Sequence, residues 1–275
     1  MLQAAPPMIR FTRSAADGVS PLITAAAAAD SDFWWQGPGG TFVGKQPNIG
    51  NFGVGDFTLR AKTWAHVTAL NFSGRKLAAL NLRRALGLGI PSFAANSNTN
   101  WHPSLGFVLP QWVTFFDLAS GGPVGDVSAM LAAMPPAMTY FNLNACSALT
   151  GDAGLSVIPT TLSYFGLAST AITGDVSAIA LVANLASLRL FSMATSYGTG
   201  GMFASATLNG ASYLVNDCGW SLAEVDRVLA DCVTSGTTGA TLNVAGTNAS
   251  PTDGVNNANR LELVNNRSWT VTVTV

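Results

Sequence analysis

Three repeated Gly-Asp steps carry carboxylates whose regular spacing could support metal binding or catalysis. They occur in the phrases VGDVSAML, TGDAGLSV and TGDVSAIA, which contain Asp126, Asp152 and Asp175. A column of carboxylates could bind calcium, which needs several oxygens converging at roughly 2.3 to 2.6 Å. Successive turns would separate these carboxylates by about 5 Å, and no second acidic residue lies near any of them in the sequence. We therefore expect structural caps that accept hydrogen bonds from the amides opening a short helical turn, with no metal site and no cofactor.

Other groups that could support catalysis are few. His66 and His102 are the only histidines, glutamate occurs only twice, and no GxSxG, HExxH or P-loop motif is present. The paired carboxylates of a glycoside hydrolase would have to come from the same three Asp residues. Cys146, Cys218 and Cys232 form no CxxC pattern, so neither a disulfide framework nor a zinc site follows. We predict that the chain is not an enzyme and has no catalytic residues; an enzyme acting on polysaccharide is the least favoured alternative.

The charge of the chain is unusually low. Hydrophobic residues make up 48% of the 275 residues and charged residues only 10%, against roughly 25% charged in typical soluble domains. The net charge of −1 argues against nucleic acid as a partner. No apolar run is long enough for membrane insertion, and charged residues interrupt the segment before Ile23, so we expect no cleaved signal. A surface so poor in charge indicates that neighbouring subunits cover much of it.

The middle of the chain repeats an aromatic-x-leucine step. Successive copies are offset by 25, 24 and 26 residues, and weaker copies lie near Leu70, Tyr213 and Leu242. Residues 83–110 hold no clear copy, so an irregular turn or insertion is expected there. The four clear copies are VTFFDLASG (113–121), MTYFNLNAC (138–146), LSYFGLAST (162–170) and LRLFSMATS (188–196). This alignment predicts two internal columns: Phe116, Phe141, Phe165 and Phe191, then Leu118, Leu143, Leu167 and Met193.

This pattern resembles the leucine-rich repeat, L-x-x-L-x-L-x-x-N/C-x-L with a period of about 20 to 29 residues. The resemblance covers about residues 64–250, with Phe in place of the central Leu and no Asn ladder. It implies an α/β fold: a leucine-rich-repeat-like solenoid with a parallel β-sheet and short helical return segments. One such unit cannot bury its own apolar side, so stacking of neighbours would build the core.

The two ends of the chain differ from the repeats. Residues 1–55 are predicted to be an irregular, loop-rich N-terminal segment. It is a possible docking arm with Phe33, Trp34 and Trp35 as anchors, unless these aromatics cap the chain's own core. Residues 56–275 are predicted to be the leucine-rich-repeat-like domain. Its C-terminal cap, at about 221–275, should contain helices at 221–236 and 256–267 and a final strand.

Two outward-facing columns are the candidate binding residues. In a strand of this pattern the residues between the apolar positions face away from the core. One column contains Phe115, Tyr140 and Tyr164, and a second contains Asp117 and Asn142. Exposed aromatics often mark an interaction site; the alternative is that the N-terminal aromatic segment or a second layer of the chain covers them.

The C-terminal phrase GWSLAEVDRVLADCVTSGTTGATLNVAGTNASPT, followed by RSWTVTV, supplies a second resemblance. Together with the TGDVSAL-type repeats, it is similar to repeat proteins of tailed bacteriophages and prophages, over about residues 113–275. The resemblance implies a non-enzymatic structural protein of the virion, tail- or fibre-associated or decorating the head, assembled in the host cytoplasm. The implied partners are other virion proteins, in a homo-oligomer or symmetric assembly, and the host cell surface. The alternative is a bacterial surface or secreted leucine-rich-repeat adhesin.

Overall fold

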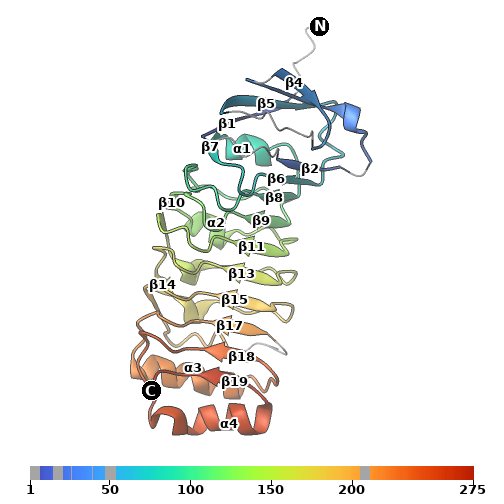
Figure 1. Ribbon diagram of the computed structural model, residues 1–275. Helices are drawn as coiled ribbons and strands as arrows, with labels where there is room; N and C mark the ends of the chain where they lie inside the picture. The colour runs from blue at the N-terminus through green and yellow to red at the C-terminus, as the bar shows by residue number, and fades with distance from the viewer. Residues whose placement is uncertain (1–6, 15–20, 26, 39, 47–53, 205–210) are drawn as a thin grey trace. The chain divides into compact units, whose positions relative to one another are not determined.

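The computed structural model describes residues 7–14, 21–25, 27–38, 40–46, 54–204 and 211–275 (Figure 1). The protein is mixed α/β, mostly sheet with few helices, and includes a ten-stranded, mostly parallel sheet. The chain divides into two compact units. The first contains Met1–Ser104 and Leu109–Val124, and the second contains Leu105–Val108 and Gly125–Val275.

An antiparallel sheet with the strand order β4-β3-β5-β1-β7 occupies much of the first unit. Buried and exposed residues alternate along its strands. On the buried side, the ring centroid of Phe11 lies 5.3 Å from that of Phe57 and 6.2 Å from that of Trp35. The range 1–55, predicted to be loop-rich, therefore contains strands whose partners lie far away in the sequence. The five strands of this sheet are β1 (Met8–Arg13), β3 (Phe33–Gly37), β4 (Gly40–Val43), β5 (Gly55–Ala61) and β7 (Leu77–Leu80).

A second group of strands in the first unit has the order β2-β6-β8-β9. The strand β2 (Leu22–Thr24) is antiparallel to β6 (Ala69–Asn71), and β8 (Ser92–Ala94) and β9 (Phe115–Asp117) continue in parallel. The strand β8 lies in the range 83–110, where the sequence predicts an irregular turn or insertion. Its Phe93 is in register with Leu70 and Phe116, and Ala95 stands where the sequence pattern has leucine. The helices here are η1 (Asp30–Asp32) and α1 (Leu82–Leu86).

The second unit is built on six parallel strands that lie side by side in chain order (Figure 1). Their central residues are in register and fully or nearly fully buried, which confirms the predicted parallel sheet. The strands are β11 (Tyr140–Asn142), β13 (Tyr164–Gly166), β15 (Ser187–Arg189), β17 (Ser212–Leu214), β18 (Thr241–Asn243) and β19 (Thr270–Thr272). The central residues are Phe141, Phe165, Leu188, Tyr213, Leu242 and Val271.

The predicted register is correct for Phe141 and Phe165 and wrong for the following copy. Leu188, not Phe191, pairs with Phe165, and Phe191 is only half-buried. The alignment fails because Phe191 imitates the repeated phenylalanine, whereas the strand that forms three residues earlier buries both Leu188 and Leu190.

Two Gly-Asp steps form short strands, and a short helix or helical turn follows each of the three. The strand β10 (Gly125–Asp126) pairs in parallel with β12 (Leu149–Thr150), and β14 (Gly174–Asp175) pairs in parallel with β16 (Thr195–Ser196). The helices that follow are α2 (Ser128–Ala132), η2 (Ala153–Leu155) and η3 (Val176–Ala178).

One backbone turn recurs after the parallel strands. A non-glycine residue with φ between 53° and 58° lies four residues after the central residue of each of six strands. This left-handed conformation is uncommon for residues other than glycine. The residues are Ser97 and Ser120 in the first unit, and Ala145, Ser169, Ser192 and Asp217 in the second.

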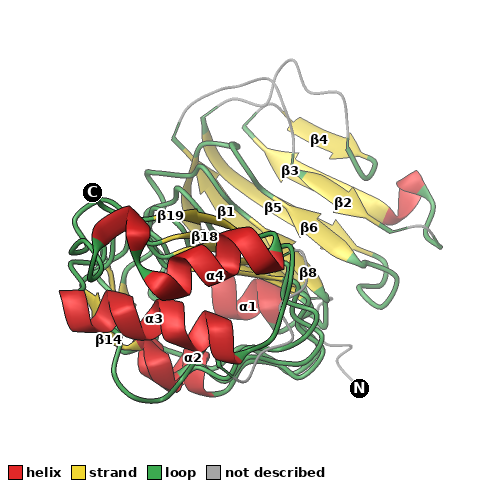
Figure 2. Ribbon diagram, turned by 90° about the horizontal axis from the view of Figure 1, so that it is seen from below, coloured by secondary structure: helices red, strands yellow, loops and turns green. Residues whose placement is uncertain are grey.

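Two helices pack side by side at the C-terminal end of the second unit (Figure 2). They are α3 (Leu222–Thr234) and α4 (Ala258–Arg267), preceded by η4 (Gly254–Asn256). A capping box begins α3: the Ser221 hydroxyl accepts from the Glu224 amide, and Glu224 accepts from the Ser221 amide. The inner face of α3, which includes Val228 and Leu229, is fully buried.

Candidate binding surfaces

A stacked pair of tyrosines lies on the outward side of the second unit's sheet. Tyr140 and Tyr164 occupy equivalent positions in β11 and β13. Their ring centroids are 4.5 Å apart with an interplanar angle of 14°, and both side chains are partly exposed. An offset or near-parallel aromatic pair of this kind presents a large and rigid contact area.

Two asparagines fix the orientation of these rings. Asn142 Nδ2 donates to the Tyr140 hydroxyl at 3.2 Å, and Asn144 Nδ2 donates to the Tyr164 hydroxyl at 2.7 Å. Asn144 is itself held, because its Oδ1 accepts from the Ala168 amide at 2.8 Å. Each ring is therefore anchored at its hydroxyl end by a neighbouring amide.

Gly166 and Arg189 complete this region, in register with each other on β13 and β15. A Cβ at position 166 would lie 2.7 Å from Asn144 Nδ2 and 2.9 Å from the Tyr164 ring, so a larger residue would have to displace these side chains. The Arg189 guanidinium carbon lies 5.6 Å from the centroid of the Tyr164 ring, a cation–π contact. We call Tyr140, Asn142, Asn144, Tyr164 and Arg189 the tyrosine face.

The structure brings together three of the five predicted binding residues: Tyr140, Asn142 and Tyr164. The other two, Phe115 and Asp117, belong to β9 in the first unit. Asp117 and Asn142 were expected to face outward, yet each is only 7% exposed. Hydrogen bonds compensate for the burial of these polar side chains. Asp117, for example, accepts from Asn96 Nδ2 at 2.8 Å and from the Ala119 amide at 3.1 Å.

Sequence reasoning did not select Arg189 or Asn144 as binding residues. The available signal for Arg189 is its isolation, because it is the only Lys or Arg between Arg84 and Arg227. Asn144 carries no comparable signal, since its role depends on the position of Tyr164 on the neighbouring strand.

The three proposed docking anchors alternate along β3. Phe33 and Trp35 are fully buried in the first unit, where Trp35 Nε1 donates to the Gly44 carbonyl at 2.7 Å. Trp34 points to the opposite side and is 38% exposed. Phe33 and Trp35 thus contribute to the chain's own core, and Trp34 alone of the three presents a large exposed surface.

The carboxylates of the Gly-Asp steps accept hydrogen bonds from backbone amides. Asp152 and Asp175 are the N-cap residues of η2 and η3, and accept from Gly154 and Ser177, respectively, at 2.9 Å. Asp126 lies one residue before the N-cap of α2 and accepts from the Ser128 amide at 2.8 Å. The glycine before Asp175 has a φ of 111°, a conformation that side chains resist.

Asp175 should make stability depend on pH. Burial opposes its ionisation, but hydrogen bonds from Ser177 and Gly198 and the charge of Arg227 together hold its pKa below the usual 3.8. Because the folded pKa lies below the unfolded one, this contribution is complete above about pH 4 and is lost as the pH falls through the folded pKa. Asp175→Ala should lower the free energy of unfolding by about 1 kcal/mol at neutral pH and by less near about pH 2.5, as measured by urea denaturation.

A suitable control for this prediction is Asp30→Ala. Asp30 is exposed and makes no side-chain hydrogen bond among the described residues. Its replacement should change stability little at either pH. An Asp175→Ala effect of the same size at both pH values would contradict the prediction.

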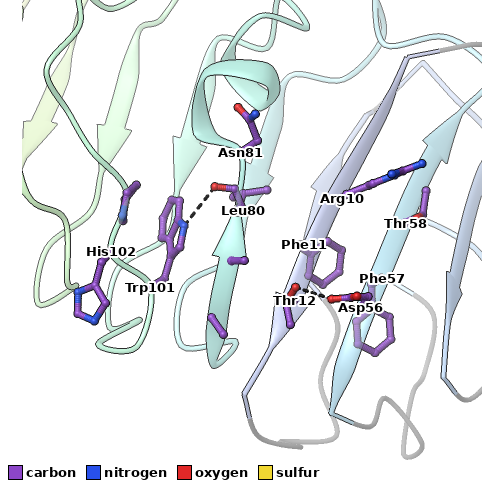
Figure 3. A pocket seen from close by; sticks show the side chains of 13 residues that line it. Arg10, Phe11, Thr12, Asp56, Phe57, Thr58, Leu80, Asn81, Trp101 and His102 are labelled. Atoms are coloured by element: carbon purple, nitrogen blue, oxygen red, sulfur yellow. Dashed lines mark hydrogen bonds between the residues drawn. The ribbon is translucent and has the colours of Figure 1, made fainter.

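A cavity with a volume of about 730 Å³ lies in the first unit (Figure 3). Its walls come from four separate segments, at 10–12, 56–58, 78–81 and 101–103. Thr12 Oγ1 donates to Asp56 Oδ1 at 2.5 Å, and Trp101 Nε1 donates to the Leu80 carbonyl at 3.2 Å. His102 is exposed, and its Nδ1 lies 2.8 Å from a backbone carbonyl oxygen. The cavity offers polar groups for hydrogen bonding, and its assembly from distant segments makes it invisible to local sequence patterns.

The three cysteines are free and buried. Burial raises the pKa of the Cys218 thiol to about 11 and that of Cys232 well above its usual value. A thiol with a raised pKa is mostly protonated at neutral pH and is a poor nucleophile. Both thiols therefore pack as small apolar groups.

In the described part of the chain, no three His, Cys, Asp or Glu side chains gather as a metal site would require. Among the helices of the same residues, none is long and apolar enough to cross a membrane. Comparison with known protein families, curated proteins and solved structures finds no match to this chain.

Proposed function

We propose that this chain is a non-enzymatic structural protein of a bacteriophage particle, and that it uses a leucine-rich-repeat-like solenoid to bind another surface through the tyrosine face. The proposal has three parts: the scaffold, the binding face and the location in a virion. A separate observation supports each part.

The spacing of the parallel strands supports the scaffold. The central residues from Phe141 to Val271 recur at intervals of 23 to 29 residues and remain in register. This interval falls within the range of leucine-rich repeats, about 20 to 29 residues. The helices α3 and α4 would shield the last layer of the core, as solenoid ends require.

The stacked pair of Tyr140 and Tyr164 is the observation that carries the binding function. Both rings are partly exposed, and amides fix both hydroxyls before any partner arrives. Rigid aromatics lose little conformational entropy on binding, which favours tyrosine among the residues that dominate interface energies.

The virion location is supported by the sequence. The ending from Gly219 resembles the C-terminal parts of phage repeat proteins, and the segment between Arg84 and Arg227 carries a single lysine or arginine, Arg189. A charge-poor surface suits a subunit whose neighbours cover it. The same binding face would serve a bacterial adhesin, so location in purified particles separates the two functions.

The test uses particles propagated on susceptible bacteria. Peptides of this chain should be recovered from purified particles by mass spectrometry. The Tyr140→Ala/Tyr164→Ala double variant of the full chain should bind those bacteria at least about tenfold more weakly than the wild type, since truncated hot-spot aromatics cost about 2 kcal/mol or more.

Trp112→Ala supplies the matched control. Trp112 lies in the first unit and is 46% exposed, so its replacement removes a similar aromatic surface that does not belong to the tyrosine face. Its binding should match the wild type, and thermal unfolding should show that both variants are folded. Absence of the chain from particles would reject the virion location, and wild-type binding by the double variant would reject the tyrosine face as the binding surface.

A further inference from the structure

The outward side of the second unit's sheet is polar and almost uncharged beyond the tyrosine face. Strand register places hydroxyl groups in line with the tyrosines, and it places Arg189 and a second amide side chain, Asn243, in the same column as Asn142. Arg189 is its only charged side chain, and Leu214 its only aliphatic one, among the described strand residues. The first column is Tyr140, Tyr164, Ser187, Ser212, Thr241 and Thr270, and the second is Asn142, Gly166, Arg189, Leu214, Asn243 and Thr272.

Arg189 lacks the partners that a half-buried guanidinium normally has. Its Nε is buried and makes no hydrogen bond with the described residues. It forms no ion pair with a described acidic residue, and its guanidinium instead makes the cation–π contact with the Tyr164 ring. A half-buried cation without an ion-pair partner costs free energy, which an anion bound at the exposed part of the guanidinium would recover. The planar fork of a guanidinium matches a carboxylate in particular.

The surroundings of Arg189 favour a sugar over a protein as the source of this carboxylate. The buried core of a protein interface is mostly apolar, whereas on this side of the sheet only the two tyrosines and one aliphatic residue, Leu214, stand among polar side chains. Serine, threonine and asparagine side chains both donate and accept hydrogen bonds, as sugar hydroxyls do. The partly exposed tyrosine rings add an apolar surface against which the C–H groups of a sugar could pack.

We propose that this side of the sheet binds an acidic polysaccharide, with the carboxylate of a hexuronate residue on Arg189 and neighbouring sugar hydroxyls on the serine, threonine and asparagine side chains. This inference rests on the proposed function, because it identifies the class of ligand that the tyrosine face recognises. Binding should weaken with added salt, since the ligand is a polyanion.

The experiment measures binding of the full chain to three hexuronate polymers: polygalacturonate, alginate and hyaluronan. Carboxyl-reduced forms of the same polymers retain the hydroxyls but lack the negative charge. We expect at least one native polymer to bind, and its reduced form to bind at least about tenfold more weakly. Arg189→Gln should cause a similar loss for the native polymer, and Arg189→Lys a smaller one, because it keeps the charge but not the fork.

Arg84→Gln is the matched control, since Arg84 is exposed on α1 in the first unit. It should bind as the wild type does, and thermal unfolding should show that every variant is folded. Polyglutamate tests for unspecific attraction of a polyanion and should bind at least about tenfold more weakly than the best hexuronate. Equal binding of polyglutamate, equal binding of the reduced polymer, an unaffected Arg189→Gln variant, or no binding to any of the three polymers would each overturn the inference.

The two proposals fail in different ways. If the double tyrosine variant loses binding to bacteria but no hexuronate binds, the ligand class is wrong and the proposed function stands. If a hexuronate binds through Arg189 but the chain is absent from particles, the virion role fails and the ligand class stands.

Discussion

Replacing Asn248 with alanine is expected to lower the free energy of unfolding by about 3 to 5 kcal/mol. Asn248 is only 2% exposed, and its Oδ1 accepts from the amides of Cys218 and Trp220, both at 3.0 Å. Its Nδ2 donates to the carbonyls of Val215 and Val244, both at 2.9 Å. Alanine would leave four buried backbone groups without these partners, each at a cost of about 1 to 3 kcal/mol, partly offset by relaxation and entering water. Urea denaturation followed by circular dichroism measures the change.

Two further variants sharpen this test. Asn248→Asp keeps the shape of the side chain but turns a carboxylate oxygen toward two carbonyls, so it should be at least as destabilising at neutral pH. Asn265→Ala is the matched control, because Asn265 is exposed on α4 and makes no side-chain hydrogen bond among the described residues. A loss at Asn248→Ala no larger than at Asn265→Ala would show that the four contacts do not support the fold.

Phe165→Ala is expected to cost about 3 to 5 kcal/mol, the usual range for removing a phenylalanine from a well-packed core. Phe165 is fully buried, and its ring centroid lies 5.8 Å from that of Phe141 on the preceding strand. Leu188 is its register neighbour on the following strand. Because neighbouring strands share this core, the cavity would loosen contacts on both sides, and the midpoint of thermal unfolding should fall accordingly.

Phe191→Ala tests the register as well as the energy. If the chain paired as the sequence alignment predicts, Phe191 would follow Phe165 in the internal column and its loss would cost as much. The structure places Phe191 in a half-buried position outside that column. We therefore expect less than about half the cost of Phe165→Ala, and equal costs would favour the sequence-based register.

The stacking of Phe141 and Phe165 is predictable because two adjacent copies keep the same spacing of phenylalanine and leucine. The register of the next strand is not predictable in this way. Its central residue is Leu188, but Phe191, three residues later, matches the sequence pattern better. Small differences in the length of the return segment thus defeat an alignment that relies on the most conspicuous residue.

The antiparallel sheet of the first unit is harder to predict for a different reason. Its strand β1 pairs with β5, more than forty residues later, so Phe11 meets Phe57 through a contact that no local period encodes. The tyrosine face is an intermediate case. The sequence places Tyr140, Tyr164 and Asn142 on one side of the sheet, but it cannot place Arg189 there without the register of β15. The position of the one charged residue of the tyrosine face therefore follows only from the folded structure.

The left-handed residue that follows successive strands has an evolutionary consequence. The chain leaves strands such as β11, β13 and β15 through the same φ, at Ala145, Ser169 and Ser192, so each return segment begins with the same backbone turn. Unequal recombination within the gene would then insert or delete such a segment without redirecting the chain at either junction. Each event would lengthen or shorten the sheet by one strand spacing, about 4.8 Å. The span available to the proposed polymeric ligand would thus be inherited as a copy number, separately from the side chains proposed to bind it.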